Sequence, residues 1–270
     1  MTTDDEVLTR AQAVRVLTDG ELTLEGRLVD ASNVTLRAFA SLDEATVRCV
    51  YKPIRGERPL WDFPDGTLAA REVAAYVVSE ATGWSVVPPT VMRDGPLGPG
   101  ACKLWIDEPE EATPLVGFVP ADEVPQGWLP IADAQDDDGR EYLLAHADAA
   151  PLARMALFDV VVNNADRKGG HVLPPVDGHL YGVDHGVCFH VDDKLRTVLW
   201  GWIGRPVPAR SIRTLTRVLG ELNGELGARL CALLSPDEVA ATTVRLERLL
   251  ADGVFPGPPR GGRAMPWPPI

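Results

Sequence analysis

A polar loop near the middle of the chain carries side chains suited to catalysis. Residues 163–171 read NNADRKGGH. In phosphoryl-transfer loops an aspartate orients the attacking hydroxyl and accepts its proton, and a metal-binding side chain follows five positions later. Asp166 and His171 have this spacing, and Lys168 between them could stabilise a charged phosphoryl group. We therefore predict catalytic roles for Asp166 and Lys168 and a metal-binding role for His171. The alternative is an exposed turn, because Asn, Asp and Gly are common turn residues.

A second acidic position follows a short apolar strand. Residues 181–186 read YGVDHG, so that the strand runs into Asp184 and then Gly186. An aspartate placed there can bind a Mg²⁺ ion that bridges nucleotide phosphates, and a glycine allows a sharp turn. Asp184 lies 18 residues after Asp166 (184 − 166), which is room for one loop and one hairpin. This separation favours two carboxylates around one metal–phosphate centre, although a plain hairpin turn would also contain these residue types.

Two further residues form a candidate phosphate-binding pair. Lys52 ends a predicted strand (VRCVYK), and Glu72 lies in the first turns of the helix that follows. A strand lysine that holds nucleotide phosphates needs an anionic partner, which a helix carboxylate supplies. Alone the pair is weak evidence, since exposed Lys and Glu are common on protein surfaces.

Hydrophobic spacing and turn residues predict the elements that position these side chains. A strand-rich first third is followed by an irregular segment, 107–140, and then by a mainly helical half; we predict helices over 6–17, 68–82, 151–162, 209–222 and 236–250, and strands over 21–28, 34–40, 46–52, 86–92, 101–106 and 179–183. Segregation of this kind predicts an α+β fold with two lobes. We expect an N-terminal lobe over 1–106, a C-terminal catalytic lobe over 107–252, and a Pro/Gly-rich tail, 253–270, without fixed structure.

The composition narrows the classes of protein. The 270 residues are 45% hydrophobic and 24% charged, with 26 Lys and Arg against 39 Asp and Glu, which gives a net charge of −13. So acidic a chain lacks the cationic surface that nucleic-acid binding and attachment to anionic lipids require. Four scattered cysteines and the lack of a signal peptide or a long apolar run predict a soluble, cytoplasmic protein without stable membrane insertion.

The two loops together resemble a known superfamily. FDVVVNNADRKGGHVL and LYGVDHGVCF are similar to the catalytic and metal-binding loops of the phosphatidylinositol 3/4-kinase superfamily, and closest to those of the type II phosphatidylinositol 4-kinases. REVAAYVVSEATGWSVVPPTVM is similar to the helix and strand that follow the nucleotide lysine in that family. The resemblance spans about 52–189 and points to an actinobacterial branch of the superfamily, with a layout shared by the HipA-type protein kinases. It implies a two-lobed protein-kinase-like or phosphatidylinositol-kinase-like fold that uses ATP and Mg²⁺.

The resemblance also assigns roles to single residues. Lys52 would bind phosphates and Glu72 would hold it, while Asp166 would be the catalytic aspartate and Asp184 the metal ligand. Ser32 and Asn33 would form a turn over the nucleotide phosphates. The hinge that contacts the adenine would be formed by Leu104, Trp105 and Ile106.

His171 departs from the family pattern, which has asparagine as the second metal ligand. Mg²⁺ prefers oxygen ligands, whereas imidazole suits softer metals. Three accounts are open. In the first, His171 does not bind the metal itself and instead holds one of its ligands in place. In the second, Mn²⁺ replaces Mg²⁺, and in the third, phosphoryl transfer is impaired and the protein is a nucleotide-binding pseudokinase.

Two other readings concern the surroundings of Asp184. Four of the five histidines, at 171, 179, 185 and 190, fall within twenty residues, which would suit a His-rich metal enzyme, although no HExxH pattern is present. Lys194 and Arg196, with Arg205 further on, are expected to recognise an anionic substrate, or else are scattered surface charge. The acceptor hydroxyl could belong to a lipid, a small molecule or a protein, and a nucleotidyl transferase is a further alternative.

Overall fold

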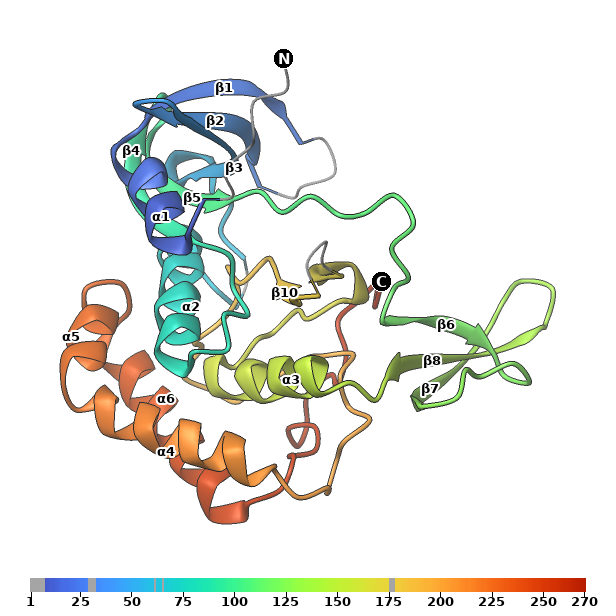
Figure 1. The fold of residues 1–270 in the computed structure, drawn as a ribbon. Helices are drawn as coiled ribbons and strands as arrows, with labels where there is room; N and C mark the ends of the chain where they lie inside the picture. Colours follow the sequence, from blue (N-terminus) through green and yellow to red (C-terminus); the bar gives the residue numbers. More distant parts are fainter. Residues whose placement is uncertain (1–7, 29–32, 61, 65, 175–177) are drawn as a thin grey trace.

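The protein has two lobes, a β-sheet lobe and a mainly helical lobe (Figure 1). The computed structural model describes residues 8–28, 33–60, 62–64, 66–174 and 178–270. In chain order the elements are α1 (Arg10–Asp19), β1 (Glu21–Arg27), β2 (Leu36–Leu42), β3 (Ala45–Pro53), η1 (Ile54–Gly56), α2 (Leu68–Thr82), β4 (Thr90–Gly95), β5 (Gly98–Leu104), β6 (Val116–Pro120), β7 (Trp128–Gln135), β8 (Glu141–Ala147), α3 (Ala150–Val162), η2 (Gly169–His171), β9 (Val172–Leu173), β10 (Tyr181–Gly182), α4 (Ala209–Leu222), α5 (Glu225–Cys231) and α6 (Pro236–Asp252).

The N-terminal lobe is an antiparallel sheet in the order β1-β2-β3-β5-β4. Along β2 every second residue is buried, because side chains in a strand alternate between its two faces. Leu36, Ala38 and Ala40 therefore pack with Leu17 of α1 in one apolar core. Thr9 and Gln12 form a reciprocal capping box that starts α1. This sheet fixes β3, the strand that carries Lys52.

Helix α2 is the element that joins the two lobes. It packs on β4 and β5 on one side and on α3, α4 and α5 on the other, and Figure 1 shows it between the sheet and the helices. Glu57 accepts hydrogen bonds from the first two main-chain N–H groups of α2, at Leu68 (3.2 Å) and Ala69 (2.7 Å). A carboxylate there also faces the positive end of the helix dipole. Gly83 ends the helix in the left-handed conformation (φ 66°).

The C-terminal lobe is built on α3, whose apolar residues form the centre of its core. Leu152, Met155, Leu157 and Phe158 are fully buried there, and α6 and α4 complete the packing. The helix ends at Asn163, which adopts a left-handed conformation (φ 53°) and starts the polar loop. The predicted α+β fold class with two lobes is confirmed by this arrangement.

Two sequence predictions for the C-terminal lobe were wrong. Two parts of the segment expected to be irregular form the strands β6 and β7, which pair with β8 in a three-stranded sheet, β6-β8-β7, that projects from the body of the protein (Figure 1). Strong pairing between β7 and β8 overrides the Pro and Gly content on which the prediction rested. The helix α5 was also missed, because a run of seven residues gives little periodic signal.

The tail, 253–270, has a defined path along the C-terminal lobe, contrary to the sequence prediction. Phe255 is buried, and main-chain N–H groups of the lobe donate to carbonyls of the tail: Gly169 to Pro269 (2.8 Å) and Thr197 to Ala264 (3.2 Å). A Pro-rich strip suits this role, since carbonyl acceptors remain where prolines supply no N–H donor. Within the described residues, none of the helices has the length and apolar character needed to cross a bilayer.

Candidate active site

Lys52 and Glu72 meet as a buried ion pair between the sheet and α2. The Lys52 ammonium lies 2.5 Å from Glu72 Oε1 and 2.8 Å from Asp184 Oδ1. Although burial disfavours the charged form, Asp184 and Glu72 raise the pKa of Lys52 above its ordinary value. Residues from β3, from α2 and from the loop after β10 therefore converge on one cation.

A second lysine, which the sequence analysis missed, shares the same carboxylate. Lys103 on β5 lies 2.5 Å from Glu72 Oε2, and the main-chain N–H of His185 donates to that oxygen (3.1 Å). Burial would raise the pKa of Glu72, whose side chain is 1% exposed, but Lys103 and Lys52 hold it well below the usual range. Burial also lowers the pKa of Lys103, and Glu72 only partly offsets this. The signal in the sequence was a lysine beside Ala101 and Cys102 in an apolar strand.

Asp184 is held in an unusual backbone conformation with its carboxylate accessible. Its φ is 59°, in the left-handed region that non-glycine residues rarely adopt, and its side chain is 51% exposed. Such conformations cluster at functional sites because surrounding contacts must hold them. The Lys52 ammonium lowers the pKa of this carboxylate despite partial desolvation. Asp184 is thus a carboxylate that is charged at neutral pH and open to a ligand.

His171 faces Asp184 in a geometry that suits a shared cation. Its Nδ1 lies 2.9 Å from the carbonyl oxygen of Asp166, which can only accept, so Nδ1 carries the proton. Nε2 then presents a lone pair 3.5 Å from Asp184 Oδ2. Burial lowers the pKa of His171 to about 4, which keeps the imidazole neutral at pH 7. Asp184 and His171 thus direct electron pairs toward the same space. A hydrogen bond from the other ring nitrogen to a carbonyl commonly fixes the orientation of a metal-binding histidine.

This pair fits a divalent cation only if other ligands join it. Among the described residues no group of three or more His, Cys, Asp or Glu side chains could hold a metal ion alone. Phosphate oxygens and water would have to complete the coordination shell, as they do for Mg²⁺ in nucleotide sites. Carboxylate and water ligands suit Mn²⁺ as well as Mg²⁺, so the Asp184 carboxylate fits either ion.

Asp166 lies on the same loop, with its carboxylate only partly buried. Its main-chain N–H donates to Asn164 Oδ1 (3.0 Å), and Lys168 Nζ lies 3.6 Å from Asp166 Oδ2. Burial raises the pKa of Asp166 to about 6, because Lys168 only partly offsets the desolvation and Asp184 adds repulsion. A carboxylate with this pKa is mostly deprotonated at pH 7 and more basic than an ordinary aspartate.

A fully buried ion pair ties the two loops together, and the sequence analysis missed it. Arg167 and Asp159 are both 0% exposed and form two hydrogen bonds of 2.8 and 2.9 Å. The same guanidinium donates to the carbonyls of His171 and Val183 (3.1 Å each), and Nη2 lies 2.7 Å from His185 Nε2. Arg167 therefore fixes the loop of Asp166 against the loop of Asp184.

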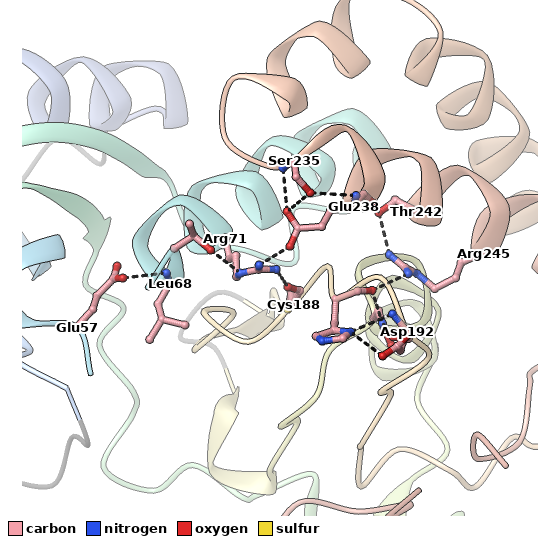
Figure 2. Close-up of polar contacts among 12 residues, drawn as sticks. Glu57, Leu68, Arg71, Cys188, Asp192, Ser235, Glu238, Thr242 and Arg245 are labelled. Atoms are coloured by element: carbon pink, nitrogen blue, oxygen red, sulfur yellow. Dashed lines mark hydrogen bonds and ion pairs between the residues drawn. The ribbon is translucent and has the colours of Figure 1, made fainter. Parts of the chain in front are cut away.

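A second polar network supports the segment after Asp184 (Figure 2). Arg71 on α2 donates to the carbonyl of Cys188 (2.5 Å) and forms an ion pair with Glu238 on α6. Figure 2 shows Arg71 between these two partners, close to the start of α2 where Glu57 caps Leu68. The segment is therefore anchored to both lobes.

The other predicted nucleotide contacts are only partly described. Asn33 Oδ1 accepts from the main-chain N–H of Arg58 (2.8 Å), while Ser32 lies outside the described residues. Leu104 ends β5, and its main-chain N–H donates to the carbonyl of Pro89 (2.8 Å). The main-chain N–H of Trp105 donates to the carbonyl of Arg48 (2.9 Å), and Ile106 follows in the connection to the C-terminal lobe.

The cations proposed to recognise a substrate are held by one buried acid. Lys194 and Arg196 lie 3.7 and 3.3 Å from Asp62, whose side chain is 7% exposed. Arg205 does not join them, because it pairs with Asp148 (2.9 Å). Lys194 and Arg196 therefore come together at Asp62 on one surface.

The histidines do not gather around one metal. His179 Nε2 lies 2.8 Å from the carbonyl of Ser85, and His190 Nδ1 accepts from the N–H of Asp192 (2.9 Å). His185 is buried against Arg167. Within the described ranges these side chains have separate partners, and the structure does not support the alternative of a His-rich metal enzyme.

The fold and the site together define a two-lobed α+β protein with a lysine–glutamate–aspartate cluster between its lobes. The chain is 48% identical over 261 residues to Protein Rv2133c of Mycobacterium tuberculosis, covering 94% of each chain. It therefore belongs to the same family as Protein Rv2133c. No protein-family model matches the chain.

The Helicobacter pylori proinflammatory kinase CtkA is among the solved structures with a distant likeness to the chain. The likeness covers 88% of this chain and 94% of that one, at 11% identity and a TM-score of 0.42. Similarity this low carries no argument about function.

Proposed function

We propose that this protein is an ATP-dependent phosphotransferase, which moves the γ-phosphoryl group of metal-bound ATP to a hydroxyl group. The observation that carries the proposal is the position of Lys52, between Glu72 on α2 and Asp184 on the neighbouring loop. A strand lysine paired with a helix glutamate, next to a metal-binding aspartate, is the arrangement that kinases need in place for transfer. We also propose that the protein belongs to the phosphatidylinositol 3/4-kinase-like superfamily.

The residues around Lys52 would bind the triphosphate. Lys52 and Lys103 face the carboxylates of Glu72 and Asp184, so a divalent cation bound to Asp184 would leave one of the two positive charges to attract a phosphate oxygen. Asp184 and His171 would hold the divalent cation, Mg²⁺ or Mn²⁺, which when bound neutralises charge on the phosphates. Ile106 and its neighbours, Leu104 and Trp105, would lie along the adenine, and Asn33 with Ser32 would lie over the phosphates.

Asp166 would act on the acceptor hydroxyl. Its pKa of about 6 makes it a proton acceptor at neutral pH, and Lys168 would add positive charge near the transferred group. Catalysis would consist of positioning and charge stabilisation without a covalent intermediate on the protein. Lys194 and Arg196, which meet at Asp62, would contact an acceptor that carries negative charge.

Intact-mass analysis after incubation with ATP and Mg²⁺ or Mn²⁺, with calorimetric titration of ATP, tests this proposal. We expect Asp166→Asn to retain ATP affinity within about threefold and to lose transfer by about a hundredfold or more. Asp184→Asn should instead weaken metal-dependent ATP binding by about tenfold or more, since a charged ligand is lost. Asp192→Asn, an exposed acid after the loop, is the matched control.

A gain of one phosphoryl group by the chain or by an added hydroxyl compound would support transfer, and equal activity of wild type and both variants would remove the mechanism. An adenylyl gain would identify a nucleotidyl transferase instead. ATP binding without transfer, with either metal, would identify a pseudokinase. This is the second candidate function, because His171 stands where the family has asparagine.

A further inference from the structure

A cavity of about 550 Å³ lies in the C-terminal lobe, apart from the cluster around Lys52. Its walls come from the end of α3, the segment after Asp192, α6, and residues 254–260 of the tail. The lining includes none of the residues placed above in nucleotide binding or catalysis. A volume of this size is typical of sites for small organic molecules.

Arg245 on α6 gives this cavity a buried charge with no counter-ion. The residue is 7% exposed, and it forms no salt bridge with any carboxylate among the residues that the structure describes. Its guanidinium donates to the carbonyls of Val161 (3.4 Å) and His190 (3.0 Å) and to Thr242 Oγ1 (2.8 Å). Figure 2 shows the contact between Arg245 and Thr242. Buried charges are ordinarily paired, so this one is an exception that needs a cause.

The charge remains in place at neutral pH. Burial lowers the pKa of Arg245 to about 10, and Asp193 and Glu238 only partly oppose that shift. A guanidinium has five N–H donors, and the three hydrogen bonds leave two without an acceptor in the described part of the chain. Two donors on a planar group match the two oxygens of a carboxylate or phosphate.

The rest of the lining agrees with an anionic occupant. It contains three arginines and two aspartates, Arg245, Arg248, Arg260, Asp193 and Asp252, and so has one net positive charge in a chain of net charge −13. Arg248 and Asp193 neutralise each other at 2.8 Å. Leu195, Leu249 and Val254 supply apolar wall between the charged groups.

We propose that this cavity binds a small organic anion, with a phosphate or carboxylate group on Arg245 and an apolar body against Leu195 and Leu249. The bound anion supplies the missing counter-ion, and the apolar walls exclude water from the pair. This site is independent of the proposed phosphotransfer.

The anion would lie next to contacts that hold the functional loops. Asn163, which lines the cavity, donates through Nδ2 to the carbonyl of His190 (2.9 Å), the same oxygen that Arg245 binds. Asn163 also accepts from the N–H of Lys194 (2.9 Å). The proposed site therefore shares its hydrogen bonds with the segment that follows Asp184.

Calorimetric titration of the full chain with phenyl phosphate and with sodium benzoate tests the proposal, with neutral benzyl alcohol as a third probe. We expect at least one anion to bind, and Arg245→Gln to weaken that binding by about tenfold or more, as for the loss of a charged hydrogen bond. Tighter binding of phenyl phosphate assigns a phosphate ligand, and tighter binding of benzoate assigns a carboxylate. Either outcome supports the site, whereas equal binding of benzyl alcohol would overturn it.

Three variants distinguish this cavity from other cationic surfaces. Arg15→Gln removes an exposed charge on α1 and should leave binding unchanged. Lys52→Met should also leave it unchanged, because the anion would otherwise be in the nucleotide site. If Arg245→Gln does not fold, Arg260→Gln decides, with an expected weakening of about threefold. Unaltered affinity in Arg245→Gln or in that substitute, or loss of binding in Lys52→Met, overturns the proposal.

Discussion

Glu72 and Asp159 are two buried carboxylates whose ion pairs differ in their access to solvent. Asp159 has one cationic partner, Arg167, and both side chains are inaccessible to solvent. Glu72 has two, Lys52 and Lys103, one of which also contacts the half-exposed Asp184. The Arg167–Asp159 pair holds the two loops together, and it has no charge left for a ligand. In the cluster, Lys52 and Lys103 face two carboxylates, and Lys52 and Asp184 are partly exposed, so these charges are open to an incoming ligand.

The largest effect on stability is expected when the Arg167–Asp159 pair is removed. Arg167→Met leaves Asp159 buried without a cation and removes the donors to His171 and Val183. We expect a loss of about 3–5 kcal/mol in the free energy of unfolding, as for other broken buried ion pairs. Urea denaturation followed by fluorescence measures this. The control, Arg15→Gln, removes an exposed pair with Asp43 (3.8 Å) and should change stability by about 0.5 kcal/mol or less. A similar loss in both variants would refute the structural role of Arg167.

The second prediction concerns pH and the cluster around Glu72. Glu72→Gln leaves Lys103 buried without its counter-ion, so its pKa, already lowered by burial, should fall further below the unfolded value of about 10.5. Between those two pKa values the unfolded chain binds more protons, so stability rises with pH.

The loss in unfolding free energy relative to wild type should therefore be about 2–4 kcal/mol at pH 7 and smaller at pH 10. Denaturation of both proteins at the two pH values measures the difference. A loss that stays constant or grows between pH 7 and pH 10 would show that Lys103 is not the group responsible.

The smallest effect on stability is expected from Lys103→Met, which leaves Lys52 as the cation that contacts both Glu72 and Asp184. Glu72 keeps Lys52, and a buried cation is replaced by an apolar side chain, so stability should change by about 1 kcal/mol or less. ATP affinity should fall by about threefold to tenfold, since one positive charge near the proposed phosphate position is lost. Titration with ATP and Mg²⁺ measures this, and affinity equal to wild type would mean that the charge of Lys103 does not act on the nucleotide.

The sequence identified the residues whose spacing is local to a motif. Asp166 and His171 on one loop, and Asp184 before a glycine, could be predicted because the chemistry fixes their separation along the chain. Lys52 and Glu72 were found from the strand and helix that carry them. The structure brings Lys52, Glu72, Asp184 and His171 into direct contact, while their roles in catalysis remain predictions.

The missed residues depend on pairing across the fold. Lys103 reaches Glu72 from another strand, and Asp159 reaches Arg167 from inside an apolar helix, where the sequence predicted only packing. The tail was mispredicted because its hydrogen-bond partners belong to the C-terminal lobe. Composition describes what a segment can do alone and does not identify the donors that a distant surface offers it.

Helix α2 has a consequence for how the molecule comes apart. Its apolar residues belong to more than one core, since Ala74 and Tyr76 pack with the helices of the C-terminal lobe while Ala69 and Val73 pack with Ala101 of the sheet. Neither lobe can lose its structure without exposing one side of this helix to water. The two lobes are therefore one cooperative unit in denaturation, although their shapes are distinct.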